Sequence, residues 1–226
     1  SFTVGTISEA LAGDQRNNYV LHVAVPPDRS DAVTDRILFD GRSFSHGEAH
    51  CWCWADQRNG SALLVRRLNR IAFSDPFPFS AGRADLDTPV QEASLEIRLP
   101  GWNRLEEAWA GDTALASGTA GPLGSTRFAF RVGTVWAGFR LAAAEAGWEL
   151  AADEQGLILR HRFWQRDRKT AKTVALLAEA GEASPGAADF AAFRANLAAG
   201  RFDTAPGCFR FERDGLTLAV ELEPFG

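Results

Sequence analysis

Alternation of apolar and polar positions is the commonest pattern along this chain, and it predicts β-strands, in which successive side chains point to opposite faces of a sheet. Residues 93–99 (ASLEIRL) and 126–132 (TRFAFRV) show it most clearly. Residues 3–11 and 19–25 are rich in strand-forming residues with partial alternation. We expect all four segments to be strands.

Three further pairs of β-rich runs flank short turn sequences and predict β-hairpins. The first pair is 50–57 and 61–68, joined through Asn59-Gly60, two residues that tolerate the positive φ of tight turns. The second spans 148–164 around Glu154-Gln155-Gly156, and the third spans 208–222 around Asp214-Gly215.

Helical spacing appears in three places. Residues 31–39 (DAVTDRILF) place Val33, Ile37 and Leu38 on one face of a predicted helix. Two more helices are predicted at 134–147 and 186–199, where Gly147 and Gly200 are suited to end a helix. Residues 170–180 fit a helix or a strand. Helices mixed with hairpins predict an α+β fold, for which we expect tandem ferredoxin-like (β-α-β) modules with antiparallel sheets.

A run of small and polar residues at 111–125, with four glycines, is the best candidate for a linker. It divides the chain into two predicted α+β domains, residues 1–110 and 126–226, the second of which carries the basic strand described below.

Composition narrows the class of protein. Of the 226 residues, 46% are hydrophobic and 23% are charged, which is typical of a globular chain rather than a disordered one. No apolar run approaches the length of a membrane span, and we expect no membrane partner. Three cysteines, two of them in a C-x-C pair, favour a reducing cytoplasmic setting. No P-loop and no G-x-G-x-x-G motif is present, so no cofactor is expected.

Charge is unevenly distributed. Residues 160–172 (RHRFWQRDRKTAK) carry six basic residues and one acidic residue, so this segment is +5 in a chain of net charge −5. On a strand, Arg160, Arg162 and Trp164 would share one face, where guanidinium groups can bind phosphates and the indole can stack on a base. The pattern therefore favours RNA binding; the alternative is a solvated edge strand whose charges prevent aggregation.

Two sets of histidines could carry chemistry. His22 follows Tyr19 on a predicted strand, and its near-neutral pKa would suit proton transfer, although a structural role is the alternative. His46, His50, Cys51 and Cys53 offer four zinc ligands, but C-x-C is shorter than the usual zinc spacing, and the two thiols could equally be core residues. We therefore expect no metal site and keep this cluster as an alternative.

Several features in order resemble the CRISPR repeat-RNA endonucleases of the RAMP superfamily. They are a strand at 3–11, the run Tyr19-Val20-Leu21-His22, the segment DAVTDRILFD, and a helix leading to Gly200 and then Gly207-Cys208-Phe209, which is similar to that family's glycine-rich loop. The resemblance implies a metal-independent endoribonuclease that forms a 2′,3′-cyclic phosphate. His22 would then act as base or acid and Tyr19 would orient the RNA.

The arginines that would hold the RNA are chosen by charge. The predicted RNA-binding residues are Arg66, Arg67, Arg160, Arg162, Trp164, Arg166, Arg168 and Lys169. The expected partner is a structured repeat RNA. A different hypothesis is a non-catalytic assembly subunit of a multiprotein or phage-type complex, whose interfaces would draw on seven tryptophans and sixteen phenylalanines.

Overall fold

The structure is a computed structural model in which the chain forms three antiparallel sheets. One α-helix and one 3₁₀ helix accompany the sheets in the part of the chain that the structure describes. The described residues are 22–24, 32–41, 51–68, 91–142, 146–168, 172–183, 189–205 and 207–222.

Sheets A and B are the two large sheets. Sheet A has the strand order β1 (His22–Ala24), β2 (Ala32–Phe39), β5 (Glu92–Leu99), β12 (Gly156–Gln165), β11 (Glu149–Asp153) and β8 (Gly121–Pro122). Sheet B has the order β3 (Cys51–Arg58), β4 (Ser61–Leu68), β13 (Thr173–Glu182), β10 (Val135–Leu141), β9 (Arg127–Val132), β6 (Glu107–Ala110) and β7 (Thr113–Ala114). The 3₁₀ helix η4 (Trp102–Arg104) follows β5.

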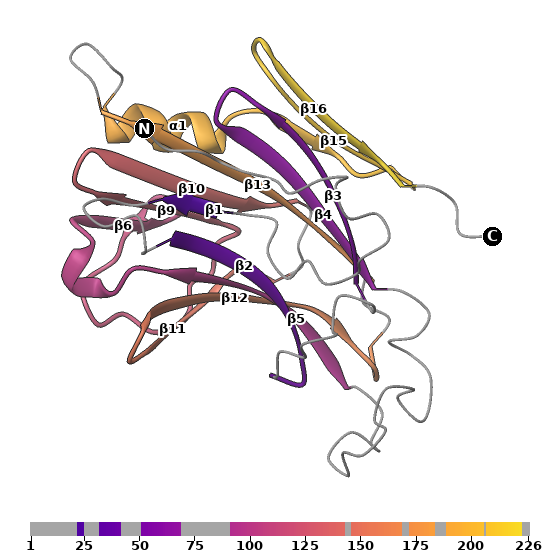
Figure 1. Cartoon of the computed structure of the whole chain (residues 1–226), viewed down its shortest axis with the longest axis horizontal. Helices are drawn as coiled ribbons and strands as arrows, with labels where there is room; N and C mark the ends of the chain where they lie inside the picture. The colour runs from indigo at the N-terminus through magenta and orange to yellow at the C-terminus, as the bar shows by residue number, and fades with distance from the viewer. Residues whose placement is uncertain are drawn as a thin grey trace.

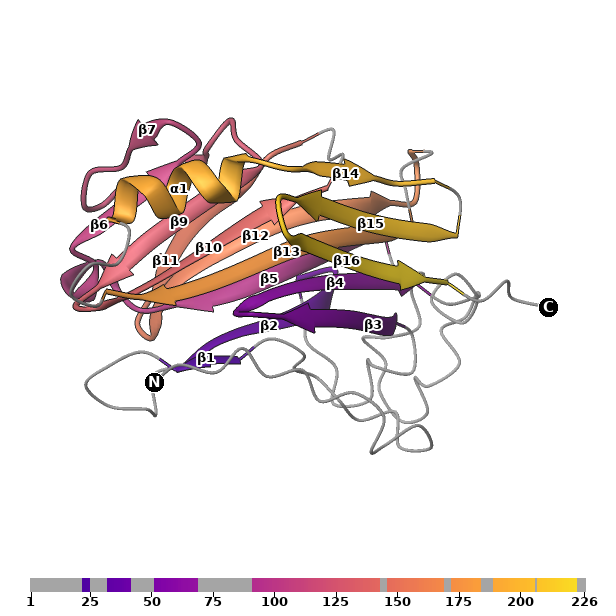
Figure 2. The ribbon, with the colours of Figure 1, turned by 90° about the horizontal axis from the view of Figure 1, so that it is seen from above.

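A third layer covers the other side of sheet B. It consists of the helix α1 (Phe190–Ala198) and sheet C, which is formed by β14 (Arg201–Asp203), β15 (Cys208–Arg213) and β16 (Leu216–Glu221). Figure 1 shows the three layers, with sheet B in the middle, and Figure 2 shows α1 and sheet C lying side by side over it. Sheet B is therefore buried on both faces.

Each gap between layers holds its own hydrophobic core. Between sheets A and B, side chains such as Ile97, Phe139 and Trp148 are at most 1% exposed. Between sheet B and the third layer, Leu63 and Leu177 pack with Phe211 from sheet C and with the apolar face of α1. Burial of this apolar surface is the main force that holds the three layers together.

The predicted α+β fold with tandem ferredoxin-like modules is wrong, because two of its expected helices are strands. Residues 32–39 form β2, in which Val33 and Phe39 face the core while Arg36 faces outward. Residues 135–141 form β10 in the middle sheet. Since β10 is buried on both faces, apolar residues occupy both of its sides and mimic the spacing of a helix.

The structure agrees with the sequence predictions at three hairpins and one helix. The segment 170–180, which fitted either element, contributes to the strand β13 (Thr173–Glu182), and the hairpins around Asn59-Gly60, Gly156 and Gly215 are confirmed. Asn59 and Gly60 adopt φ values of 49° and 77°, as expected for this turn. Within the predicted helix 186–199, the structure has α1 over Phe190–Ala198, with its first turn capped by Asp189, and residues 186–188 lie outside the described residues.

The segment 111–125 carries β7 and β8, which join sheets B and A respectively. Strands from both sides of this segment pair within both large sheets; β5 pairs with β12, and β4 pairs with β13. The predicted strand 3–11 lies outside the described residues, and only 22–24 of the predicted strand 19–25 are described, as β1.

Candidate functional site

A buried ion pair joins the two large sheets. Asp35 of β2 and Arg66 of β4 are 1% and 4% exposed, and Nη2 of Arg66 donates to Oδ2 of Asp35 at 2.6 Å. Arg66, one of the predicted RNA-binding residues, is thus enclosed between the sheets, where a phosphate chain has no access. Its neighbour Arg67 is half-buried and, as the next residue along β4, points to the other face of sheet B.

Cys53 of β3 lies in the electrostatic field of this ion pair. Burial raises the pKa of the Cys53 thiol to about 11; Arg66 opposes this rise and Asp35 adds to it. The thiol donates to the carbonyl of Trp54 at 3.8 Å and packs against the core between sheets A and B. Because zinc binds the thiolate, a thiol held protonated at neutral pH is poorly suited to be a ligand.

We predict that Cys53 resists alkylation in the native chain. At pH 8 its thiolate fraction should be about a hundredfold smaller than that of a thiol with the ordinary pKa, so the rate should fall by a similar factor. Peptide mapping by mass spectrometry after timed iodoacetamide treatment measures this rate, with the denatured chain as control. Equal rates for Cys53 in the native and denatured chains would contradict the prediction.

The alternative metal cluster is only partly described. His46 and His50 lie outside the described residues, as does the side chain of Cys51. Among the residues that the structure describes, no group of three or more histidine, cysteine, aspartate or glutamate side chains could hold a metal ion. Cys53 is the one member of the predicted cluster whose surroundings are known.

The outer face of sheet A carries a cluster of arginines around one carboxylate. Glu96 of β5 is fully buried beneath them, and its neighbours across the sheet are Arg36 of β2 and Arg160 of β12. Arg36 donates to Oε1 of Glu96 through Nε at 2.7 Å and also through Nη2, while Nη2 of Arg160 donates to Oε2 at 3.0 Å. A third guanidinium, that of Arg98, lies 3.8 Å from Oε1.

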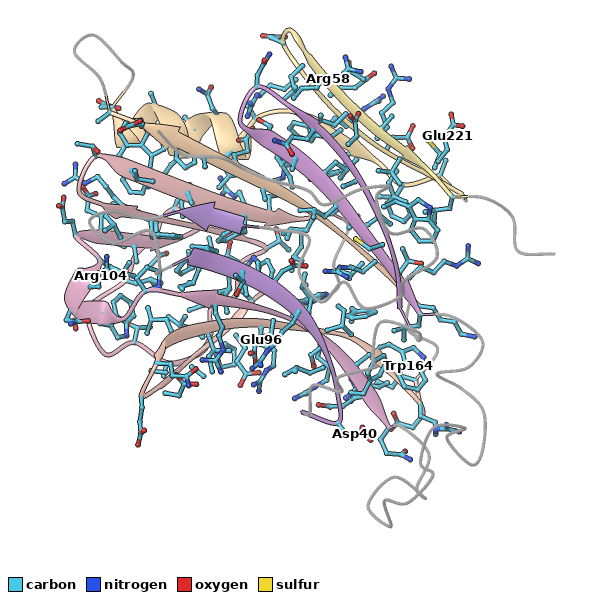
Figure 3. All side chains as sticks on the ribbon, viewed as in Figure 1. Asp40, Arg58, Glu96, Arg104, Trp164 and Glu221 are labelled. Carbon is cyan, nitrogen blue, oxygen red and sulfur yellow. The ribbon has the colours of Figure 1, made fainter. Side chains whose placement is uncertain are left out.

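The arginine cluster, which we define as Arg36, Arg98, Arg160 and Arg162, remains accessible although it is paired. The four side chains are between 26 and 46% exposed, and Arg162 pairs with Glu92 at 2.7 Å. Figure 3 shows Glu96 on the outer side of sheet A. Glu96 lies below the guanidinium groups, whereas Glu92 and Asp153, the partners of Arg162 and Arg98, are 29% and 36% exposed and reach the solvent beside them.

The other residues of the predicted basic strand have different positions. Trp164 is only 5% exposed and packs in the core between sheets A and B, so its ring is not available to stack on a base. A register shift between Arg162 and Trp164 breaks the alternation on which the prediction relied and turns the indole inward. Arg166 is half-buried and Arg168 is exposed, while Lys169 lies outside the described residues.

His161, in the same strand, faces the core. Burial lowers the pKa of its imidazole, and a hydrogen bond to the carbonyl of Gly147 at 3.3 Å partly offsets this effect. Because a carbonyl only accepts, Nδ1 must carry the proton in this contact. The ring of Trp148 meets the imidazole edge-on at 6.1 Å. His161 is therefore a residue of the core, whose burial favours the neutral imidazole.

Of the two predicted catalytic residues, Tyr19 lies outside the described residues, and only the backbone of His22 is described. His22 belongs to β1, at one edge of sheet A, and its Cα pairs with that of Thr34 in β2. Thr34 in turn pairs with Arg98 of β5. The structure thus places the backbone of His22 in the same sheet as the arginine cluster.

A pocket that the sequence did not predict lies at one end of sheet A. It has a volume of about 500 Å³ and is formed where β5 runs into η4 and where the β11–β12 hairpin turns. Trp102, Asn103 and Arg104 line it from η4, and Asp153 and Gln155 line it from the hairpin. Arg98 also lines the pocket, which therefore adjoins the arginine cluster.

The hairpin turn is fixed tightly against the end of β5. Asp153 accepts hydrogen bonds from the backbone N–H groups of Gln155 and Gly156, and Nη1 of Arg98 contacts it at 2.9 Å. The bond from Gln155 is the largest of the effects that hold the pKa of Asp153 below its usual range. Gly156 has a φ of 147°, and a Cβ there would lie 2.4 Å from the carbonyl oxygen of Leu99, so only glycine fits.

Comparison with protein-family models, with curated proteins and with solved structures found no match for this chain. Within the described ranges, no helix combines the length and apolar character that crossing a membrane requires. The candidate site must therefore be judged on its own geometry.

Proposed function

We propose that this chain binds RNA, and that the outer face of sheet A is the surface that holds it. The arginine cluster is the observation that carries the proposal. Three of its guanidinium groups gather on one buried carboxylate, so their orientation is set before any ligand arrives. A guanidinium has five N–H donors, and those that the carboxylates do not use can bind phosphate oxygens in a forked geometry.

Two features of the chain favour this surface over the rest of the molecule. The net charge is −5, so attraction of a polyanion depends on a local concentration of basic groups rather than on the whole protein. The buried position of Glu96 leaves the positive ends of its ion pairs toward the solvent. Arg160 and Arg162, which the charge of their own segment predicts to bind RNA, belong to this cluster, and Arg36 and Arg98 complete it.

The test is a fluorescence anisotropy titration with a labelled pool of short stem–loop RNAs at about 50 to 200 mM salt. We expect Arg160→Ala to weaken binding roughly fivefold at the lowest salt and to reduce the salt dependence by about one phosphate contact. Each lost contact should change the slope of log K against log salt by about 0.7 to 0.9.

Arg131→Ala is the matched control for this experiment. Arg131 lies on β9 of sheet B and is also paired, with Glu106 at 2.9 Å and Glu107 at 3.2 Å, and its exposure of 34% is close to the 32% of Arg160. Its replacement should leave RNA binding unchanged. Absence of any binding by the unaltered chain at the lowest salt would falsify the proposal, and so would equal losses in the two variants.

A further inference from the structure

The pocket at the end of sheet A has the composition of a site for a single nucleotide. Its volume of about 500 Å³ lies within the usual range of small-molecule sites. Its lining combines one indole, from Trp102, with the side-chain amides of Asn103 and Gln155, with two guanidinium groups, from Arg98 and Arg104, and with two carboxylates, from Asp153 and Glu154. A nucleotide joins a flat base, ribose hydroxyls and a phosphate, and each has a matching group in this lining.

Trp102 is held by the fold in the position that this role requires. It packs against the core between sheets A and B but is only partly buried, so part of the indole remains at the pocket wall. The backbone N–H of Leu105 donates to the carbonyl of Trp102 at 3.2 Å and closes the short 3₁₀ turn that carries it. A base entering the pocket would meet an aromatic surface that is already fixed.

Arg98 connects the pocket to the arginine cluster. Its guanidinium contacts Glu96 of the cluster at 3.8 Å and, at the pocket, it bonds to Asp153 at 2.9 Å and to Gln155 at 3.1 Å. A phosphate bound at Arg98 would therefore lie at the mouth of the pocket and on the path of a polymer that crosses sheet A.

We propose that the pocket receives one unstacked nucleotide of the RNA that sheet A binds. Trp102 stacks on the base, the amides of Asn103 and Gln155 contact its polar edge, and Arg98 holds the adjoining phosphate. This inference rests on the proposed function and adds to it that the bound RNA is single-stranded at the pocket, because a paired base is not free to enter.

The experiment uses the full chain with two probes, the four ribonucleoside monophosphates and a labelled single-stranded RNA. Isothermal titration calorimetry should show saturable binding of at least one monophosphate. Trp102→Ala should weaken it about tenfold or more, since the ring stacks on the base. Trp102→Phe should restore most of the affinity. Asn103→Ala tests the pocket at an exposed residue, where loss of folding is not a concern, and should also weaken binding.

Arg201→Ala, on the exposed surface of sheet C, is the control and should change nothing. One outcome would overturn the pocket alone: no monophosphate binds, and RNA binds as tightly to Trp102→Phe, Trp102→Ala and Asn103→Ala as to the unaltered chain. If RNA binding then still depends on Arg160, the proposed RNA surface on sheet A is retained. If no RNA binds, the proposed function fails and this inference with it. Binding of glucuronate as strongly as any monophosphate would overturn the assignment to a nucleotide.

Discussion

Replacing Asp35 with alanine should destabilise the fold by about 3 to 5 kcal/mol. The replacement leaves the guanidinium of Arg66, which is 4% exposed between sheets A and B, without its carboxylate partner in a medium of low polarity. Chemical denaturation of the two chains, followed by tryptophan fluorescence, measures the difference in the free energy of unfolding.

Two companion variants identify the cause of this loss. Asp112→Ala removes one carboxylate of a surface ion pair with Arg127 and should have little effect, because Asp112 is 89% exposed and such pairs contribute little. Asp35→Leu combined with Arg66→Met should recover most of the stability, since two packed apolar side chains can replace a buried pair. A single Asp35→Ala variant as stable as the unaltered chain would show that Arg66 finds another partner.

Glu96→Gln should change stability and RNA affinity in opposite directions. The three guanidinium groups around Glu96 lose their shared negative charge, and we expect a loss of about 2 to 4 kcal/mol in the free energy of unfolding. The same change makes the outer face of sheet A more positive by one unit. RNA should therefore bind roughly fivefold more tightly, which corresponds to about 1 kcal/mol.

The matched control is Glu179→Gln. Glu179 is also a buried carboxylate, at 4% exposed, held by Ser61 at 2.7 Å and by both terminal nitrogens of Arg213, at 2.7 and 2.9 Å. It lies on the other side of sheet B, under sheet C. We expect a comparable loss of stability without any gain in RNA affinity. An RNA affinity of Glu96→Gln equal to that of the unaltered chain, at a temperature where the variant is folded, would contradict the assignment of sheet A as the binding surface.

Short sequence patterns predict the turns and hairpins of this protein, but they do not predict how its three layers stack. Asn59-Gly60 and Asp214-Gly215 lie at hairpin turns because the backbone conformation they favour is set by neighbouring residues alone. The spacing of apolar residues in β10 predicts a helix, whereas the residues that decide its structure are distant in the sequence. The residues that bury its two faces come from sheet A and from α1, which are distant in the sequence.

The same contrast between local and distant residues explains why the sequence predicts only part of the candidate site. Arg160 and Arg162 were found from the charge of their own segment, whereas Arg36 and Arg98 come from two other strands of sheet A. Trp164 was misplaced because the irregularity after Arg162 depends on the pairing of β12 with β5. Trp102 and Gln155 belong to turns that are visible in the sequence, but only the paired strands show that these two turns meet at one pocket.

The middle position of sheet B also affects how the molecule assembles. Within this sheet, β4 pairs with β13, and Ser61 bonds to Glu179 across 118 residues of chain. A nascent chain must therefore keep β4, which is buried over most of its length in the folded protein, unpaired at that edge until synthesis has passed β13. Such long-range pairing slows folding and exposes strand edges that favour aggregation, so this chain should depend on slow synthesis or on chaperones more than a helical protein of equal length.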